Sequence, residues 1–213
     1  MLQIKNLGIN LIKDDRDLLK DFDLALNPGD KVGLIGEEGN GKSILLKTIT
    51  RRKSVEKYAN ISGQIHKKDE IIGYLPQSLD DNLLDLTVAN YMNHILDMDI
   101  VDYNKLYKCL SDFNLDEDFV FGKLKLGDLS GGERIKVMLL FELLKEPTVF
   151  LFDEPTNDLD YKSTRFITKI MKNMKIPLIF VSHDPELLRK VANKIIHLEQ
   201  VHRRQIPRHM IFN

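Results

Sequence analysis

Residues 36–43 read Gly-Glu-Glu-Gly-Asn-Gly-Lys-Ser and fit the phosphate-binding pattern G-x-x-x-x-G-K-S/T. An apolar strand candidate, residues 31–35, comes before this phosphate loop, and a helix candidate, residues 44–50, follows it. Glycines let such a loop curl so that its N–H groups point at an anion, and the helix adds its positive end. Lys42 can then reach the β- and γ-phosphates of a nucleotide, and the Ser43 hydroxyl can bind magnesium. A glycine-rich turn with a chance Lys-Ser pair is the alternative, and the strand–loop–helix context disfavours it.

The composition describes a chain with a real core and little net charge. Its 213 residues include 31 basic and 32 acidic side chains, and 43% are apolar. This supports one large domain or two small ones, and it disfavours a globally basic nucleic-acid binder. One cysteine, Cys109, excludes an internal disulfide and fits a reducing compartment. With no signal-peptide pattern and no apolar run of membrane-spanning length, we expect a cytoplasmic protein with no direct membrane insertion.

The first two thirds of the chain change from strand patterns to helical patterns. Residues 1–35 and 61–75 carry strand candidates, with a turn signal at residues 27–30. From about residue 86 to 145 the apolar side chains fall at helical spacing. The spacing places Cys109 on an apolar helix face, where packing is its expected role.

The last third alternates strands with helices. Apolar runs at residues 149–152, 178–181 and 195–198 are separated by helical patterns. This alternation predicts a parallel sheet covered on both faces. The helical block at residues 86–145 interrupts the alternation and indicates a subdomain.

Two carboxylates, Asp153 and Glu154, directly follow the apolar run 149–152. Strand alternation is expected to send them in different directions. Asp153 can hold magnesium through water, and Glu154 can orient and deprotonate an attacking water. An acidic pair that caps a helix is the alternative, and the phosphate loop upstream favours the catalytic role.

Two other polar residues, His183 and Gln77, also follow strand candidates. Ligands of a parallel sheet bind beyond the carboxyl ends of its strands, so Gly36, Asp153 and His183 should converge. A neutral His183 imidazole can contact the γ-phosphate and hold Glu154 and the water in line. The Gln77 amide can bind magnesium and the attacking water together. Each residue taken alone would indicate only polar surface.

Two adjacent glycines lie in Leu-Ser-Gly-Gly-Glu-Arg, residues 129–134, just before a helix candidate at residues 135–145. Ser130 suits the N-cap position, and glycines at a helix start expose N–H groups to an anion. A capped helix start is the plain alternative. The chain has only one phosphate loop. A second anion-binding segment therefore indicates that this segment contacts a nucleotide held by another subunit. The residues predicted to act in this way are Ser130, Gly131, Gly132 and Glu133, the signature loop.

These segments together resemble the ATP-binding cassette (ABC) family, over almost the whole chain and in the family's order. They are Gly36–Ser43, Gln77, Leu129–Glu133, Val149–Glu154, Asn157–Asp160 and His183. The resemblance implies an α/β fold and a single P-loop ABC ATPase domain over residues 1–213. Residues 1–85 and 146–213 would form the ATPase core, with a mostly parallel sheet and an antiparallel β subdomain. Residues 86–145 would form a helical subdomain that carries the signature loop.

The resemblance also implies that two cassettes enclose two molecules of ATP, each with Mg²⁺, and that the signature loop of one closes on the γ-phosphate held by the other. The loop at the cassette interface would be Asn157, Asp158, Leu159 and Asp160. The catalytic residues would be Lys42, Gln77, Glu154 and His183, and the metal-binding residues Ser43, Gln77 and Asp153. The nucleotide would contact Gly36, Glu37, Glu38, Gly39, Asn40, Gly41, Lys42, Ser43 and Ile44. The family usually stacks an aromatic ring on adenine near residues 10–13, where this chain has none, so Leu11 or Ile12 is expected to supply apolar contact.

Within the family, the chain resembles the soluble ABC-F branch. The resemblance is carried by Glu133, by Glu-Pro-Thr-Asn at 154–157 and by Gly-Tyr-Leu-Pro-Gln at 73–77. The tail, residues 198–209, resembles the end of a first cassette in antibiotic-resistance ABC-F proteins. Such proteins act on the ribosome and carry two cassettes per chain, so the partner would be a second cassette, either a second copy or a missing second half.

Two alternatives stay open. The chain can be the ATP-binding subunit of a membrane transporter, in which a groove near Gln77 holds a helix of a membrane permease. It can also be a nucleotide-dependent assembly switch with little turnover, which the retained Lys42, Asp153 and Glu154 argue against. The basic run at residues 51–53 is expected to be a solvated face rather than an RNA site.

Overall fold

A computed structural model describes residues 1–99 and 101–199 of the chain. Most of the tail that resembles an ABC-F cassette end, residues 200–209, lies outside the described residues. Among the residues that are described, no helix has the length and apolar character needed to cross a membrane.

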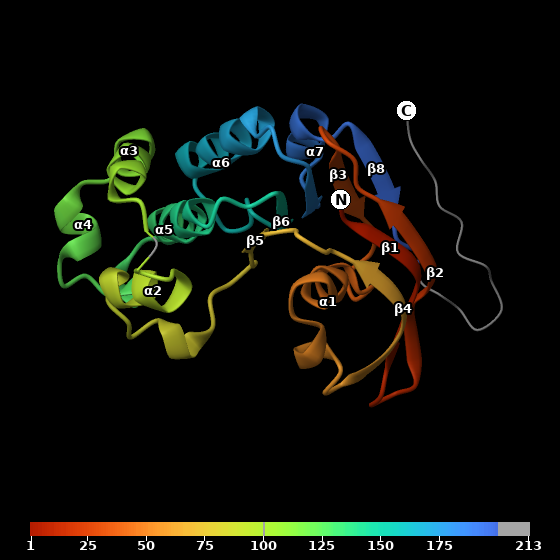
Figure 1. Ribbon diagram of the computed structural model, residues 1–213. Helices are drawn as coiled ribbons and strands as arrows, with labels where there is room; N and C mark the ends of the chain where they lie inside the picture. The colour runs from red at the N-terminus through yellow and green to blue at the C-terminus, as the bar shows by residue number, and fades with distance from the viewer. Residues whose placement is uncertain (100, 200–213) are drawn as a thin grey trace.

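A five-stranded parallel sheet forms the centre of the molecule (Figure 1). Four of its five strands are short runs of mainly apolar residues, and all five residues of the second strand in the sheet, β6, are buried. Strands buried on both faces read as continuous apolar runs, which is why the sequence pattern predicts them correctly. In spatial order the strands are β5 (Ile72–Leu75), β6 (Val149–Asp153), β7 (Leu178–Val181), β3 (Lys31–Ile35) and β8 (Lys194–His197).

The two faces of this sheet serve two different apolar clusters. On β6, Phe150 and Phe152 belong to the cluster on the side of the helical block, whereas Val149 and Leu151 belong to the cluster around the first helix. Alternate residues of a strand point to opposite faces, so a single strand contributes to both clusters. The predicted parallel sheet with both faces covered is confirmed.

A second, antiparallel sheet packs beside the core, as expected. It contains β1 (Gln3–Leu11), β2 (Arg16–Ala25) and β4 (Ala59–His66) in the order β2-β1-β4. Helix α1 (Lys42–Val55) lies between this sheet and the core sheet in Figure 1, and it shares one apolar cluster with both. The phosphate loop that precedes α1 is therefore held from two sides.

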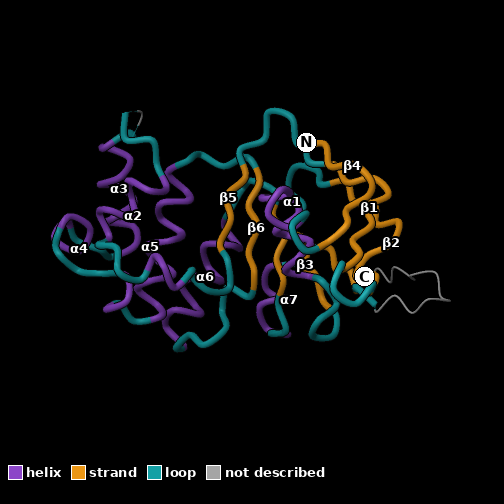
Figure 2. Tube along the Cα trace, turned by 90° about the horizontal axis from the view of Figure 1, so that it is seen from below, coloured by secondary structure: helices purple, strands orange, loops and turns teal. Residues whose placement is uncertain are grey.

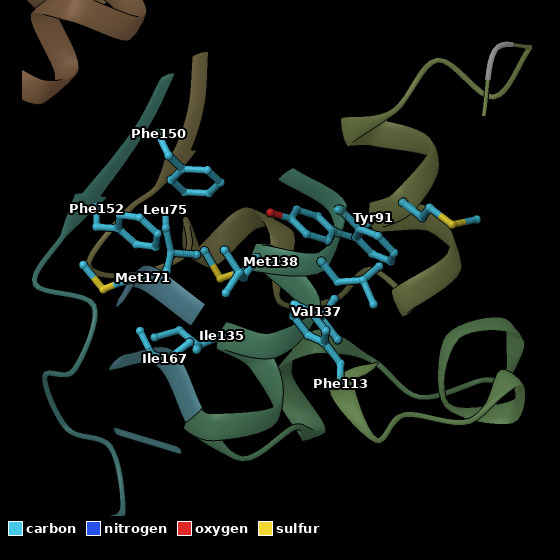
Figure 3. Packing of buried hydrophobic residues seen from close by; sticks show 14 of the residues in the cluster. Leu75, Tyr91, Phe113, Ile135, Val137, Met138, Phe150, Phe152, Ile167 and Met171 are labelled. Carbon is cyan, nitrogen blue, oxygen red and sulfur yellow. The ribbon is translucent and has the colours of Figure 1, made fainter. Parts of the chain in front are cut away.

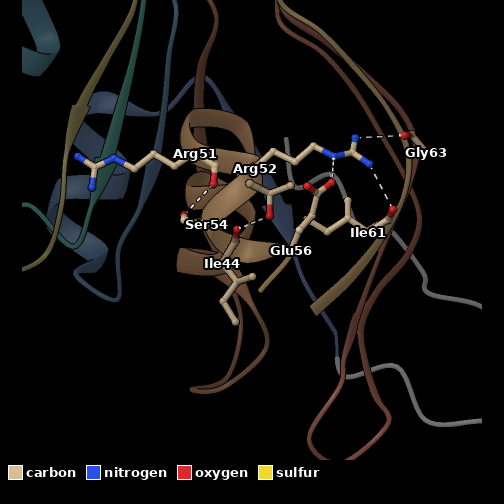
Figure 4. Close-up of polar contacts among 8 residues, drawn as sticks. Ile44, Arg51, Arg52, Ser54, Glu56, Ile61 and Gly63 are labelled. Carbon is tan, nitrogen blue, oxygen red and sulfur yellow. Dashed lines mark hydrogen bonds and ion pairs between the residues drawn. The ribbon is translucent and has the colours of Figure 1, made fainter. Parts of the chain in front are cut away.

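The C-terminal part of α1 is bent and tied to β4 (Figure 4). Arg51 has non-helical backbone angles, φ −133° and ψ 51°. Figure 4 shows the side chains of Arg51 and Arg52 pointing in opposite directions. The Arg52 guanidinium donates to the carbonyl oxygens of Ile61 at 3.2 Å and Gly63 at 3.5 Å. One member of the basic run 51–53 is thus used inside the molecule.

The helical block lies at the end of the molecule away from the antiparallel sheet (Figure 2). Its helices are α2 (Val88–Ile95), α3 (Tyr103–Phe113), α4 (Glu117–Phe121) and α5 (Gly131–Leu144). Helices α6 (Tyr161–Asn173) and α7 (Pro185–Val191) follow β6 and β7. Cys109 is half-buried on α3, packs against the apolar cluster as expected, and has a thiol pKa raised by burial.

Side chains of this block pack in one apolar cluster with those of the core sheet (Figure 3). The ring centroids of Tyr91 and Phe141 are 6.0 Å apart, and those of Phe113 and Phe166 meet edge to face at 5.0 Å. Residues from α2, α3 and α5 share one cluster with Phe152 of β6. One apolar cluster thus contains residues from both the helical block and the core sheet. The division of the chain into subdomains at residues 86 and 145 stays a prediction.

Candidate functional site

The phosphate loop joins β3 to α1, in the strand–loop–helix context that its sequence pattern requires. Gly36 has φ +148° and Gly41, the N-cap of α1, has φ +80°. A Cβ on Gly36 would lie 2.4 Å from the carbonyl oxygen of Leu198, and a Cβ on Gly41 would lie 2.9 Å from the Leu18 Cβ. Both positions therefore need glycine for conformation and for space.

Lys42 turns back onto the phosphate loop. Its ammonium donates to the carbonyl oxygens of Gly36 at 2.7 Å and Glu37 at 2.8 Å. Burial lowers the pKa of Lys42, and the nearby carboxylates of Glu154 and Asp153 act in the opposite direction. A buried cation whose pKa falls on burial is stabilised in its charged form by an arriving anion.

Asn40 fixes the loop to the end of the core sheet. Its buried Nδ2 donates to the carbonyl oxygen of Leu198 at 2.9 Å. Its Oδ1 is buried without a partner among the described residues. The side chain thus holds the loop in place, and the predicted nucleotide contact of Asn40 would come from its backbone.

Asp153 ends β6 inside the molecule, with both carboxylate oxygens in contact with hydroxyl groups. The Ser43 hydroxyl donates to Oδ1 at 2.8 Å, and the Tyr74 hydroxyl donates to Oδ2 at 3.4 Å. Burial raises the pKa of Asp153, while the Ser43 hydrogen bond and the charge of Lys47 oppose the rise. Tyr74 is not among the residues predicted from the sequence, although it lies in the quoted segment 73–77.

The direction of the Glu154 side chain is not set by strand alternation, which is the cause expected from the sequence. Glu154 lies just beyond β6 with a left-handed backbone, φ +48°, so the turn rather than the strand sets its direction. Its Oε1 lies 3.4 Å from His183 Nε2, and its Oε2 accepts from the His183 backbone N–H at 3.3 Å. Burial raises the pKa of Glu154, and the nearby His183 opposes the rise most strongly. The strand ends of β6 and β7 therefore bring these two residues together.

Ten of the predicted residues line one cavity of about 600 Å³, whereas Gly36, Glu37, Asn40 and Asp153 do not line it. Its lining includes Glu38, Gly39, Gly41, Lys42, Ser43, Ile44, Gln77, Glu154, Asn157 and His183. Leu11 instead packs against the apolar cluster around α1, and its predicted contact stays a prediction. Arg16, the partner of Leu11 across the β1–β2 hairpin, lines the cavity and is missing from the sequence prediction.

A second cavity of about 560 Å³ shares Ser43 and Gln77 with the first, and Asp153 lines only this second cavity. Lys47 and Arg51 of α1, Tyr91 and His94 of α2, and the segment 76–80 line it. Gln77 lines both cavities, so it stands between the phosphate loop and the helical block.

The signature loop forms a tight helix start. Ser130 is the N-cap of α5, and the Glu133 carboxylate accepts from the Ser130 N–H at 2.9 Å and from its hydroxyl at 2.6 Å. These hydrogen bonds lower the pKa of Glu133. A Cβ on Gly132 would lie 2.1 Å from the Ser163 hydroxyl, so the loop rests on the start of α6. The cavity of about 600 Å³ has no lining residue from positions 130–133.

The loop at residues 157–160 connects the cavity at the phosphate loop with the signature loop. Asn157 lines the cavity at the phosphate loop. Asp160 caps α6 by accepting from the backbone N–H groups of Lys162 at 2.8 Å and Ser163 at 3.0 Å. A Cβ on Gly131 would lie 3.7 Å from Leu159, in ordinary contact. The predicted interface loop therefore runs from the cavity to the signature loop of the same chain.

A parallel sheet with a phosphate loop after β3 and carboxylates at the end of β6, with β7 between these two strands, is typical of a P-loop nucleotide-binding protein. A family model described as ABC transporter matches residues 19–157 of the chain. The chain belongs to this family, and it is an ATP-binding cassette ATPase.

Known proteins with similar sequences include ATP-binding proteins with different names. The chain is 31% identical over 192 residues to the ATP-binding protein Uup of Buchnera aphidicola subsp. Schizaphis graminum, which covers 87% of this chain and 31% of Uup. It is 31% identical over 212 residues to the zinc import ATP-binding protein ZnuC of Buchnera aphidicola subsp. Baizongia pistaciae, which covers 92% of this chain and 79% of ZnuC. The chain therefore spans about a third of the length of Uup.

A solved structure shares the fold. The chain is similar to the dimeric ATP-binding cassette MJ0796 in a post-hydrolysis state bound to ADP and Pi, with a TM-score of 0.73 and 23% identity. The match covers 95% of this chain and 97% of that one.

Proposed function

We propose that this cassette binds MgATP between its phosphate loop and the signature loop of a second cassette, and hydrolyses it there. The observation that carries the proposal is the division of the site. Lys42, Glu154 and His183 line one cavity, whereas residues 130–133 lie outside it. A second cassette, from a second copy or from a second half of the same protein, would therefore bring a signature loop to the nucleotide.

Lys42 would supply the cation for the β- and γ-phosphates. It exchanges its two loop carbonyl contacts for charge-assisted hydrogen bonds to phosphate oxygens. The backbone N–H groups at the start of α1 add the positive end of the helix dipole, and the first turn of α1 holds no acidic residue that would oppose it.

Ser43 and Asp153 fit a magnesium ion by the chemistry of their oxygen atoms. Mg²⁺ prefers hydroxyl, carboxylate and water oxygens, and the raised pKa of Asp153 marks a buried carboxylate that a cation would stabilise. Gln77 is the third proposed ligand, because it lines the cavity beside Ser43. When bound, Mg²⁺ neutralises part of the phosphate charge.

Glu154 would act as the general base. Its carboxylate takes a proton from the attacking water, and its burial-raised pKa makes it a stronger base than an exposed glutamate. His183 would position it, because the imidazole and the backbone N–H of His183 contact different carboxylate oxygens. This arrangement argues against an assembly switch with little turnover, since such a switch needs no positioned base.

For the biological role, we propose an ABC-F type cassette that acts on the ribosome, in antibiotic resistance. Glu133 and the segments 73–77 and 154–157 support this assignment. The chain's span of about a third of Uup also fits one cassette of a longer protein.

A role as the ATP-binding subunit of a membrane transporter is the second candidate. It is supported by the coverage of 79% of ZnuC and by the cavity of about 560 Å³ beside Gln77, which can hold a helix of a membrane permease. Co-sedimentation with purified ribosomes in the presence of ATP separates the two roles, because only an ABC-F cassette is expected to bind.

The experiment that tests the ATPase assignment compares two substitutions. Glu154→Gln should keep ATP affinity and lower hydrolysis by about 10²–10⁴-fold, because an amide cannot accept the proton. Lys42→Ala should abolish tight ATP binding, because the loop loses its cation. Glu186→Gln, on the exposed start of α7, is the control and should leave both unchanged. Normal ATP affinity in Lys42→Ala would rule out the phosphate-loop assignment.

A further inference from the structure

We propose that Arg16 holds the base of the bound nucleotide by stacking its guanidinium plane on the ring. Arg16 would thus replace the aromatic side chain that residues 10–13 lack. This inference rests on the proposed function, because it requires the triphosphate to lie on the phosphate loop.

Arg16 reaches over the phosphate loop from the antiparallel sheet. It begins β2 and pairs with Leu11 at the end of β1. Its side chain lines the same cavity as Lys42 and Glu154. The Arg16 Nη1 lies 3.9 Å from the point that a Cβ on Gly39 would occupy. The guanidinium therefore lies within reach of a ligand that leaves the loop at Gly39.

The hairpin lies at the end of the cavity where the base is expected. Glu154, His183 and Gln77 mark the end at which the terminal phosphate reacts. Strands β1 and β2 lie on the opposite side of α1 from β5 and β6 (Figure 1). A nucleotide whose β- and γ-phosphates contact Lys42 therefore extends its ribose and base toward Arg16.

The guanidinium is suited to stacking. The Arg16 Nε lies 3.6 Å from Asp14 Oδ2, and the two side chains are 49% and 52% exposed. An exposed ion pair of this kind contributes little free energy, so the Arg16 guanidinium can leave Asp14 for a ligand. The residues that line the cavity, all within the described part of the chain, include no Phe, Tyr or Trp. A planar guanidinium stacks on any aromatic face, which gives affinity with little base selectivity.

A contact to the phosphates is the competing role for the same cation. Inorganic tripolyphosphate separates the two roles, because it carries the phosphates of ATP without a base. Titrations of the full chain would use MgATP, MgGTP and tripolyphosphate. The variants are Arg16→Ala, Arg16→Tyr and, as a control on the same strand, Lys20→Ala, whose exposed side chain lies away from the cavity lining.

Base stacking predicts a selective loss. Arg16→Ala should weaken MgATP and MgGTP about five- to tenfold and leave tripolyphosphate unchanged. Arg16→Tyr should restore MgATP, and the wild type should bind MgGTP within about tenfold of MgATP. An equal loss for tripolyphosphate in Arg16→Ala, or no loss for either nucleotide, would overturn the stacking role. Tripolyphosphate affinity that does not change in Lys42→Ala would instead refute the proposed function, so the two failures are distinguishable.

Discussion

At the scale of single residues, burial of the ionised Asp153 carboxylate costs the folded chain free energy. Burial raises the pKa of this carboxyl above its ordinary value of 3.8, although the Ser43 hydroxyl and Lys47 favour the charged form. The folded chain therefore binds a proton at Asp153 more tightly than the unfolded chain does. The stability from Asp153 is present at low pH and is lost as the pH rises through the raised folded pKa. At neutral pH the ionised carboxylate opposes folding until a cation arrives.

Asp153→Asn should therefore stabilise the metal-free and nucleotide-free chain at neutral pH. The amide keeps the shape of the side chain, and its oxygen can still accept from the Ser43 hydroxyl. We expect the free energy of unfolding to rise, because burial penalises the ionised carboxylate and does not penalise the neutral amide in the same way. Thermal unfolding in chelator from pH 8 to pH 5 measures it, and the gain should shrink as the pH falls toward the folded pKa.

Asp160→Asn is the matched contrast. Hydrogen bonds from Ser163 lower the pKa of this exposed N-cap carboxyl, so its stabilising effect is present at neutral pH and is lost on acidification. The substitution should lower the melting temperature at neutral pH, opposite to Asp153→Asn. A destabilised Asp153→Asn variant at neutral pH would show that the hydrogen bonds of Asp153 outweigh its burial.

Sequence patterns predict some of these residues and not others. Asp153, Glu154 and His183 could be predicted because each follows an apolar run, and parallel strand ends meet at one edge of a sheet. The left-handed backbone of Glu154 could not, since residues other than glycine rarely adopt it and the pattern carries no sign of it. Arg16 could not be predicted either, because only the hairpin register brings it over the phosphate loop.

At the scale of secondary-structure elements, the close packing of α5 on α6 depends on the absence of a side chain at Gly132. The Ser163 hydroxyl, which donates to Asp160 at 3.0 Å, lies where a side chain on Gly132 would be. A Cβ on the neighbouring Gly131 would make only ordinary contacts, with Leu159 at 3.7 Å and with the carbonyl oxygen of Asp158 at 3.8 Å. The two glycines of the signature loop thus have different structural roles, although they are neighbours in the sequence.

Gly132→Ala should destabilise the chain, and Gly131→Ala should not. The added methyl group at 132 must displace Ser163 and break its hydrogen bond, a form of overpacking that costs about 1–3 kcal/mol. Alanine at 131 fits the space and favours a helix over glycine, so stability should stay unchanged or rise by about 0.5 kcal/mol. Thermal unfolding of both variants is the measurement, at roughly 2–4 °C per kcal/mol. Equal melting temperatures would contradict the close packing of Gly132 on α6.

The strands and main helices could be predicted from the sequence more fully than their arrangement. The apolar run at residues 31–35 coincides with β3, because a strand buried on both faces is apolar throughout. The order of the sheet could not be predicted, since β3 pairs with β7 and β8, which lie far along the chain. Apolar runs show which segments are buried, whereas tertiary packing decides which of them become neighbours.

At the scale of the whole molecule, the cassette presents two half-sites. The cavity at the phosphate loop contains the groups proposed to bind the phosphates and to deprotonate the water, and the signature loop lies at the start of α5 outside that cavity. The segment 154–160 runs between them, from Glu154 at the cavity to Asp160 beneath Gly132. Under the proposed function, a nucleotide bound at the phosphate loop would meet the signature loop of a second cassette.

This separation predicts that hydrolysis depends on the concentration of the chain. Specific ATPase activity should be low in dilute solution and curve upward with protein concentration, because each active site forms only on pairing. Pairing of two such chains is expected to be micromolar or weaker, since small interfaces give little net affinity. Glu154→Gln should show the pairing directly by size-exclusion chromatography, as a dimer with MgATP and a monomer without it. Specific activity that stays constant down to nanomolar protein, together with a strictly monomeric Glu154→Gln variant, would mean that one chain is a complete catalyst.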